Sequence, residues 1–334
     1  MKIYSRRYLG NKTKLIPFIS QTINNECGEF HSFFDVFAGT GSVSTAYTDK
    51  KLILNDILYS NYITYIAWFK NTNYNEELVK NLLNKYNNIP TNIPDNYMSE
   101  NFSNTFFNTN VCKKIGFIRE DIERKYQNKI INEKEKAILI TSLLYAMDRI
   151  ANTCGHYDAW RKNATYSDNL ELLSLEVFKN TNTDNEFYNM DSNVLAPKIE
   201  CDVAYLDPPY NSRQYCDAYH LLENVARWEK PEVSGVAKKM NRDIIKSDYC
   251  KKTATQAFED LVKKLNAKYI ILSYNNTGTK ANDRSNAKIS DEDIINILTQ
   301  KGNVKIFNQN HKAFSTGKSE NKDNEERLFV CQVK

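Results

Sequence analysis

The sequence predicts an α/β protein with a doubly wound, mostly parallel sheet that is interrupted by a mainly helical insertion. Apolar, strand-like runs occur in two blocks, within residues 32–56 and from residue 186 onward, and both blocks alternate with helix candidates. The region between them, 71–184, is instead rich in Asn, Lys and aromatic residues and contains long helix candidates. This order is typical of a parallel sheet into which a second domain is inserted.

We therefore expect one domain of residues 1–70 and 185–334 and an inserted domain of residues 71–184. The longest helix candidates of the insertion are 113–129 and 133–151. A later helix should begin after Ser290, with Asp293 in a capping pattern, and end at Gly302. Between the last two strands, the polar run STGKSENKDNEER (315–327) is expected to be a loop. Strands are expected in the segments 32–42, 51–56, 187–190, 203–207, 268–275, 304–307 and 328–333.

The composition is that of a globular protein without special cross-links. The chain has 334 residues, 41% apolar and 26% charged, and no apolar window long enough to span a bilayer. The start, MKIYSRRYLG, lacks the apolar core of a signal peptide, so we expect a cytoplasmic protein. Seven cysteines without a CxxC pair and four scattered histidines indicate neither disulfides nor a metal site. The net charge of +4 is compatible with a polyanionic partner but does not argue for one.

A glycine loop follows the first strand candidate. In DVFAGTGS, Gly39 and Gly41 lie at a strand-to-helix turn, where glycine lets the backbone approach a ligand closely. A dinucleotide-binding loop would have a third glycine where Ser44 stands, so a cofactor without phosphates fits better. Asp56, at the end of LILND, is then placed to bind ribose hydroxyls. The alternative is an ordinary tight turn with Asp56 as a helix cap.

The fourth strand candidate, VAYLD, runs directly into Pro-Pro-Tyr. Proline cannot donate to a sheet ladder, so Asp207 and Pro208 must lie where the strand ends. A carboxylate and an adjacent backbone carbonyl can together accept both N–H groups of a flat aromatic amine such as adenine N6. Tyr210 offers a ring on which a base can stack. The alternative is a strand-ending turn in which the aspartate caps and the tyrosine packs.

Together these motifs resemble a known family. RYLGNK, FAGTG and LDPPY, in that order, resemble the Dam-like DNA adenine N6-methyltransferases. NTCGHYDAWRK, SRQYCDAYHLLENVARW and LSYNNTG are similar to the restriction–modification subgroup that includes FokI-type modification enzymes. The resemblance spans nearly the whole chain. It implies a Rossmann-like fold with an antiparallel C-terminal strand and a target-recognition insertion.

The resemblance also implies an activity: methyl transfer from S-adenosylmethionine to N6 of a flipped-out adenine in double-stranded DNA. Asp207, Pro208 and Tyr210 would be catalytic, and an aspartate at the first of these positions favours adenine as the acceptor. Asp56 would bind the cofactor ribose. Tyr8, Gly10 and Lys12 would hold the methionine end of the cofactor. No metal is implied.

The implied ligand contacts are these. The cofactor would be contacted by Tyr8, Gly10, Asn11, Lys12, Asp35, Phe37, Ala38, Gly39, Gly41, Asp56, Asp191 and Ser192. The DNA would be contacted by Arg149, His156, Tyr157, Arg161, Lys162, Asn211 and Arg213. For the basic side chains, ordinary solvation is an equally good interpretation.

Other classes of function compete with this hypothesis. A catalytically silent DNA-binding protein on the same fold, or methylation of an amine in RNA or protein, would use much of the same sequence. A dehydrogenase fits least, because it lacks the third glycine and a proton relay. A cognate restriction endonuclease that acts on the same DNA site is an expected partner, and a monomer is the expected state.

Overall fold

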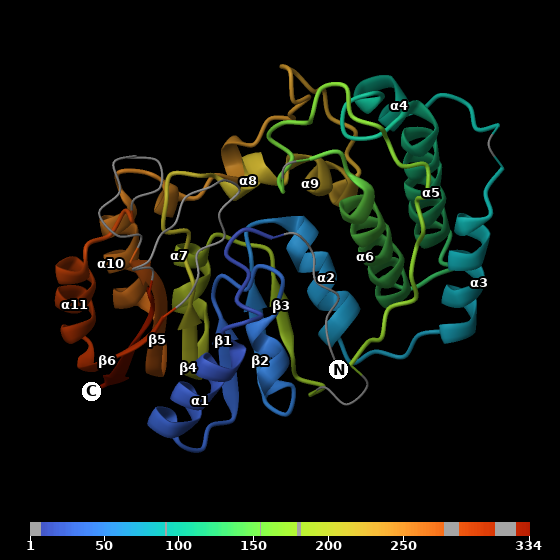
Figure 1. Ribbon diagram of the computed structural model, residues 1–334. Helices are drawn as coiled ribbons and strands as arrows, with labels where there is room; N and C mark the ends of the chain where they lie inside the picture. Colours follow the sequence, from blue (N-terminus) through green and yellow to red (C-terminus); the bar gives the residue numbers. More distant parts are fainter. Residues whose placement is uncertain (1–7, 91, 154, 179–181, 277–286, 311–324) are drawn as a thin grey trace. The chain divides into compact units, whose positions relative to one another are not determined.

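The computed structural model describes residues 8–90, 92–153, 155–178, 182–276, 287–310 and 325–334 (Figure 1). The chain divides into two compact units. We call them the sheet unit, Asn11–Ile57, Asp184–Tyr215 and Ile245–Lys334, and the helical unit, Met1–Gly10, Leu58–Thr183 and Cys216–Ile244. Residues 8–10, 58–70 and 216–244 therefore cluster with the helices, whereas the sequence placed them with the sheet.

The sheet unit contains one seven-stranded sheet in the order β3-β2-β1-β4-β5-β7-β6. The parallel pairs are β3–β2, β2–β1, β1–β4 and β4–β5, whereas β7 is antiparallel to both of its neighbours. This confirms the predicted mostly parallel sheet with an antiparallel C-terminal strand. The strands are β1 (Ser32–Asp35), β2 (Lys51–Asn55), β3 (Glu186–Tyr188), β4 (Glu200–Leu206), β5 (Asn266–Asn276), β6 (Gly302–Asn310) and β7 (Glu325–Val333).

All seven strand predictions correspond to strands, but each predicted segment differs from its strand at one end or both, and the start of β7 also contradicts a loop prediction. The run 315–327 was expected to be a loop, yet Glu325, Glu326 and Arg327 begin β7 because they pair with both β5 and β6. The rest of that run, 315–324, lies outside the described residues. The capping prediction is confirmed, since Ser290 Oγ accepts a hydrogen bond from Asp293 N at 3.1 Å.

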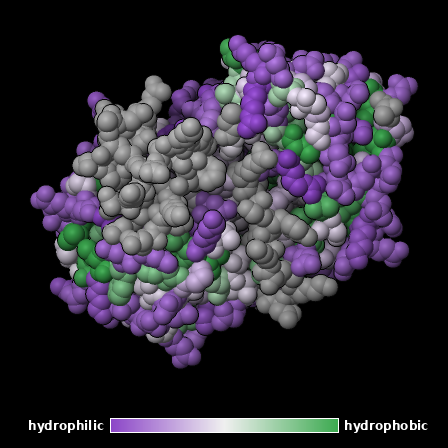
Figure 2. Space-filling view, in the orientation of Figure 1, coloured by the Kyte–Doolittle hydropathy of each residue, from purple (hydrophilic) through white to green (hydrophobic). Residues whose placement is uncertain are grey.

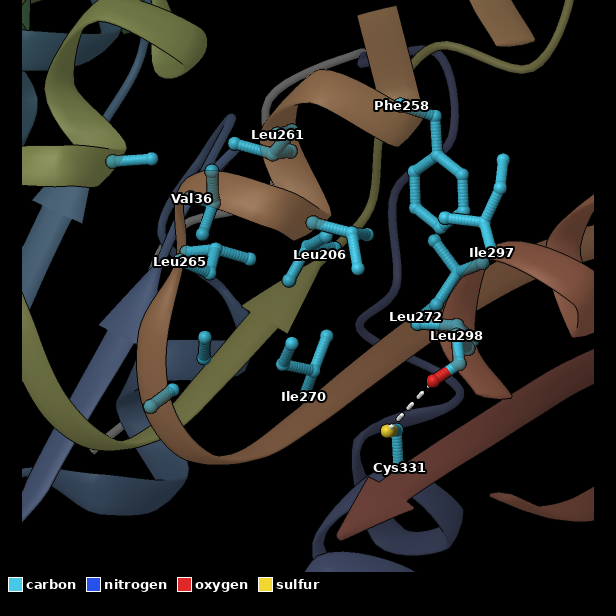
Figure 3. Close-up of a cluster of buried hydrophobic side chains, with 14 of the residues drawn as sticks. Val36, Leu206, Phe258, Leu261, Leu265, Ile270, Leu272, Ile297, Leu298 and Cys331 are labelled. Atoms are coloured by element: carbon cyan, nitrogen blue, oxygen red, sulfur yellow. Dashed lines mark hydrogen bonds between the residues drawn. The ribbon is translucent and has the colours of Figure 1, made fainter. Parts of the chain in front are cut away.

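Helices cover the sheet, and the strands alternate their side chains between its faces. On one face Val36, Leu206 and Leu272 pack against Phe258 of α10 and Leu298 of α11 (Figure 3). The Cys331 thiol reaches the Leu298 carbonyl at 3.4 Å across this cluster (Figure 3). The helices of this unit are α1 (Ile16–Cys27), η1 (Val43–Tyr47), α7 (Ser192–Leu195), η2 (Ala196–Lys198), η4 (Asp248–Cys250), α10 (Ala254–Lys264) and α11 (Asp291–Thr299).

The helical unit is built around α6, which contacts α2, α3, α5 and α9 (Figure 1). An Asn132–Glu135 capping box starts α6. This packing explains why residues 58–70 and 216–244 belong to the helical unit, since α2 and α9 bury their apolar sides against each other and α6. The helices are α2 (Tyr59–Phe69), α3 (Glu76–Asn87), α4 (Tyr97–Phe102), α5 (Thr109–Gln127), α6 (Glu133–Ile150) and α9 (His220–Arg227); α8 (Tyr215–Ala218) and η3 (Asp243–Ile245) cross the boundary.

The described residues on the face drawn in Figure 2 are mostly polar. Figure 2 shows hydrophilic residues over most of the described surface on this face, with small apolar areas between them. In the part of the chain that the structure describes, no helix is both long and apolar enough to cross a membrane.

Candidate active site

Three acidic side chains follow three neighbouring parallel strands of the sheet unit. Asp35 ends β1, Asp56 follows β2 and Asp207 follows β4. In the register of β1 and β4, Asp35 lies beside Tyr205, so these acids share the carboxyl edge of the sheet. Ligands bind at this edge in doubly wound folds. The predicted acids are therefore on one edge, although they are far apart in the sequence.

Asp35 is the most deeply buried of the three acids, with 1% of its surface exposed. Its Oδ2 accepts a hydrogen bond from Ser44 Oγ at 2.7 Å. Its Oδ1 is buried and has no hydrogen-bond partner among the described residues. Burial raises the pKa of Asp35 to about 7, although the Ser44 hydrogen bond opposes the shift. A buried carboxylate oxygen without a partner is costly, so this position favours a cationic or N–H-bearing ligand.

The glycine loop that follows β1 is hydrogen-bonded to the residues at the end of β2. Gly39 and Gly41 have φ values of +54° and +72°, in the left-handed region that glycine adopts without strain. Gly39 N donates to Asp56 Oδ2 at 3.0 Å, so Asp56 holds the loop at its turn. Ala38 N donates to Asn55 O at 2.9 Å, which fastens the loop to the end of β2. Both the turn and an acid beside it are present, as the sequence predicted.

Asp207 belongs to a buried cluster with one positive and two negative groups. Lys12 Nζ lies 3.0 Å from Asp207 Oδ1 and 3.2 Å from Glu326 Oε1. Ser273 Oγ donates to Glu326 Oε1 at 2.6 Å, and Asn275 Nδ2 donates to Oε2 at 3.4 Å. The Lys12 and Glu326 side chains are only 6% and 3% exposed, whereas Asp207 keeps 19%. Asp207 is therefore the member that a ligand can reach.

The pKa values of the three groups are shifted from their ordinary values in different directions. Burial raises the pKa of Asp207 to about 6; Glu326 adds to this and Lys12 opposes it. Burial alone would also raise the pKa of Glu326, but Lys12 and the Ser273 hydrogen bond outweigh it and leave that pKa below its ordinary value. Burial would lower the pKa of Lys12, but the two carboxylates raise it well above normal. At neutral pH the cluster thus carries a net negative charge.

The residues after Asp207 are held by the sheet unit. Pro208 is buried, and the Tyr210 ring meets Tyr274 edge-on at 6.4 Å between centroids. Tyr210 O accepts a hydrogen bond from Lys288 N at 2.9 Å. Asn211 Oδ1 accepts from Arg213 N at 3.0 Å and turns the chain there. The segment is thus fixed at both ends of the motif.

The other predicted cofactor residues of the sheet unit have structural partners. Asn11 Oδ1 accepts from Thr13 N at 2.8 Å, and the Phe37 ring packs edge-on against Tyr249 at 4.9 Å. Asp191 caps α7 by accepting from Asn193 N at 2.9 Å, next to the buried Ser192. These contacts neither require nor exclude a ligand, so the assigned roles stay predictions.

Two predicted cofactor residues belong to the helical unit. Tyr8 stacks on Tyr219 at 4.9 Å and accepts from Asn61 Nδ2 at 3.0 Å. Gly10 has a φ of +73°, which suits a glycine at a turn. Their expected contact with the cofactor stays a prediction.

The predicted DNA-contact residues of the helical unit differ in exposure. Arg149, Arg161 and Lys162 are exposed, and Arg149 donates to the Glu171 carbonyl. His156 lies beside Asp158, with 3.5 Å between Nδ1 and Oδ2. Tyr157 is only 1% exposed, and its hydroxyl donates to Asp148 at 3.3 Å. In this conformation Tyr157 supports its loop from inside, so the basic side chains are the better candidates for contact.

The sequence analysis missed Glu326 and its partners. Glu326 was hidden in the polar run 315–327, and nothing local distinguishes it from the acids around it. LSYNNTG was noted, but Ser273 and Asn275 were given no role. The available signal was that Ser273 and Asn275 directly follow the apolar run of β5, because polar groups that are buried there need partners.

Comparison with known proteins identifies the family. A family model described as D12 class N6 adenine-specific DNA methyltransferase matches residues 8–277. The chain belongs to this family. Modification methylase StsI of Streptococcus sanguinis is 34% identical over 352 residues and M.FokI of Planomicrobium okeanokoites 32% over 350, each covering 98% of this chain. Type II methyltransferase M.NlaIII of Neisseria lactamica is 31% identical over 330 residues and covers 95% of it.

The relatives differ in length. The chain spans 52% of StsI and of M.FokI but 94% of M.NlaIII. As a D12-class chain it thus corresponds to about half of the first two proteins and to nearly all of the third. The resemblance inferred from RYLGNK, FAGTG and LDPPY is confirmed.

Asp35 yields a prediction about stability and pH. Because its pKa is raised from 3.8 to about 7, the unfolded chain releases this proton at lower pH than the folded chain. The stability that Asp35 contributes is thus complete below pH 3.8 and is lost as pH rises to about 7. We expect the melting temperature of Asp35→Asn, relative to the wild type, to rise across this window and to level off above it. Thermal unfolding followed by circular dichroism at pH 4.5, 6 and 8 measures this; a constant difference would contradict the assignment.

Proposed function

We propose that this chain transfers a methyl group from S-adenosylmethionine to N6 of an adenine in double-stranded DNA. The observation that carries the proposal is the position of Asp207 and Pro208: at the carboxyl end of β4, with the carboxylate ion-paired to Lys12 yet partly accessible. Membership of the D12-class family supports the reaction, and the names of its relatives support a role in modification.

The residues at the carboxyl edge suit the proposed cofactor. S-adenosylmethionine carries an ammonium, a ribose diol and an adenine ring. Asp35 Oδ1, buried without a hydrogen-bond partner among the described residues, matches an N–H donor or a positive charge. Asp56, beside the glycine turn, is assigned to the ribose hydroxyls, and Asp191 at the end of β3 to the adenine side. The left-handed glycines leave no Cβ in the way of a ligand packed on the loop.

The acceptor nitrogen must be made more nucleophilic. The lone pair of adenine N6 is delocalised into the ring, and hydrogen-bond acceptors on both N–H groups draw the nitrogen toward tetrahedral geometry. We assign Asp207 Oδ2 and the Pro208 carbonyl to these two hydrogen bonds, because Lys12 already contacts Asp207 Oδ1. Tyr210, fixed against Tyr274, is assigned to stack on the base.

The transfer itself needs no covalent intermediate with the protein. Bound S-adenosylmethionine supplies an electrophilic methyl group on a sulfonium. As the bond between N6 and the methyl carbon forms, the carbon–sulfur bond of the cofactor would break and its electron pair would stay on sulfur. N6 becomes positive during the step, and the negative Asp207 stabilises this charge electrostatically. The proton that N6 then loses passes to Asp207 or to water.

The rest of the proposal concerns DNA. A base inside a duplex cannot reach such an edge, so the adenine must be flipped out, and basic side chains must hold the phosphates. We assign this to the exposed Arg149, Arg161, Lys162 and Arg213, with Asn211 near the base. A restriction endonuclease acting on the same sequence is the expected functional partner, and we propose a monomer acting in the cytoplasm.

A single experiment tests the reaction. Purified protein is incubated with methyl-labelled S-adenosylmethionine and unmethylated genomic DNA, the DNA is digested to nucleosides, and modified positions are mapped by single-molecule sequencing. We expect N6-methyladenine at one recurring motif. Labelled RNA or protein with unlabelled DNA would move the proposal to another amine, and cofactor binding without any transfer would indicate a DNA-binding protein on this fold.

Asp207→Ala should abolish methyl transfer and leave the affinities for cofactor and DNA within a few fold, because the carboxylate acts in the transition state. Single-turnover methylation and calorimetric titration measure the two effects separately. Asp248→Ala removes an exposed carboxylate of the sheet unit and serves as the matched control, with activity like that of the wild type. Near-normal turnover in Asp207→Ala would remove this carboxylate from the mechanism.

Asp56→Ala should instead weaken cofactor binding. Hydrogen bonds to a charged group contribute about 1.5–3 kcal/mol, so we expect the Kd for S-adenosylmethionine to rise about tenfold or more. Isothermal titration calorimetry measures it, with the exposed Asp49→Ala as the control. An unchanged Kd would refute the ribose assignment.

A further inference from the structure

Glu326 is a buried carboxylate that the proposed mechanism does not yet use. It lies on β7, opposite Asn275 of β5 in the register of the sheet, and it is only 2% exposed. Its Oε1 is 3.2 Å from Lys12 Nζ and accepts from Ser273 Oγ at 2.6 Å. A buried carboxylate must be paired or hydrogen-bonded, and Glu326 is both. What it does for the cluster depends on the ammonium that it shares.

Lys12 alone would work against Asp207. An ammonium 3.0 Å from Oδ1 compensates the negative charge that the proposed reaction uses on the adenine amine. With only Lys12 and Asp207 present, the pair would be neutral overall. Glu326 contacts the same ammonium, with 3.2 Å between its Oε1 and Lys12 Nζ, and makes the cluster net negative. In a poorly solvated site, the electrostatic effect of a net negative cluster rather than a neutral one is far larger than it would be in water.

We propose that Glu326 is a positioning residue of the methyl transfer, which holds the Lys12 ammonium and offsets its charge so that Asp207 keeps an uncompensated negative charge toward the adenine amine. The inference rests on the proposed function. Lys12 orients Asp207 through Oδ1, and Glu326 orients Lys12, so the acceptor oxygen is set by a chain of two ion pairs. Glu326 itself touches neither substrate nor cofactor in this scheme.

The pKa directions agree with this geometry. Glu326 is among the causes that raise the pKa of Asp207, whereas Lys12 lowers it. Other ionisable groups act on the cluster from the surrounding elements: Tyr205 on β4, Tyr210 after β4 and Asp35 on β1. The pKa values of both tyrosines are raised by burial, so these side chains are neutral near pH 7. Asp35 is present in both the wild type and a Glu326 variant, so a comparison of the two proteins isolates the effect of the Glu326 charge.

Glu326→Gln therefore makes a specific change in the pH profile. Without the second carboxylate Lys12 is left to Asp207, so the pKa of Asp207 falls. We expect the acid limb of kcat to move to lower pH by roughly one unit. The plateau kcat should fall about tenfold, because the net negative charge is lost, while KM for S-adenosylmethionine stays within about twofold. Steady-state methylation between pH 5 and 9 measures all three quantities.

A second variant guards against a folding defect in the first. Glu326→Asp keeps the charge but withdraws it from Lys12 by one methylene, so kcat and the acid limb should lie between those of the wild type and Glu326→Gln. Asp291→Asn is the matched control, because it removes an acid that pairs with the neighbouring Arg327, and both its kcat and its acid limb should match the wild type. Thermal unfolding of each variant gives the folded fraction for correction.

The outcomes separate the two proposals. If the wild type transfers no methyl group to DNA, the proposed function fails and the role of Glu326 fails with it. If the wild type methylates DNA but the Glu326 variants keep its kcat per folded molecule and its acid limb, only the positioning role is overturned. A loss of melting temperature without a moved acid limb indicates a purely structural carboxylate and overturns it as well.

Discussion

The site depends on the burial of one lysine ammonium between two carboxylates. Taking Lys12 out of water costs several kcal/mol, and only well-placed negative partners offset that cost. Asp207 and Glu326 are those partners, and they come from segments nearly two hundred and more than three hundred residues further along the chain. Because removal of either partner leaves a buried charge under-compensated, the three side chains fix one another. The geometry around the Asp-Pro-Pro-Tyr motif is therefore a property of the fold.

The sheet makes this arrangement possible through order and register. The strand order reverses between β1 and β4, and doubly wound sheets bind their ligands at the carboxyl ends of the strands beside such a reversal. Asp35 and Asp207 flank that point. The antiparallel β7 adds Glu326 by pairing it with Asn275, and a shift of one residue would turn this carboxylate to the other face. The sequence pattern indicates only that β7 is a strand of the sheet, but β7 also places the charge of Glu326 in the site.

What the sequence predicted was local, and what it missed depends on tertiary contacts. The strands, the glycine turn and Asp207 follow from short patterns, because alternation and proline act on neighbouring residues. Lys12 was expected at the methionine end of the cofactor, and that role stays a prediction. Its ion pairs with Asp207 and Glu326, two acids of the chain itself, were not predicted. Glu326 was not recognised because its role depends on the pairing of β7 with β5. The residue that donates a hydrogen bond to it, Asn275, lies 51 residues earlier in the sequence. The grouping of α2 and α9 with the inserted helices was missed for the same reason.

The acids at this edge are also held in an unfavourable state. Burial raises the pKa of Asp35 to about 7 and that of Asp207 to about 6, so both anions are less stable here than in water. A ligand that brings positive charge relieves this, because each anion gains the partner that burial removed. In the reaction that we propose, S-adenosylmethionine would bring an ammonium and a sulfonium, and the acceptor amine would become positive during transfer. The same burial that destabilises these anions in the free protein would therefore favour a bound cation and the transition state of the proposed reaction.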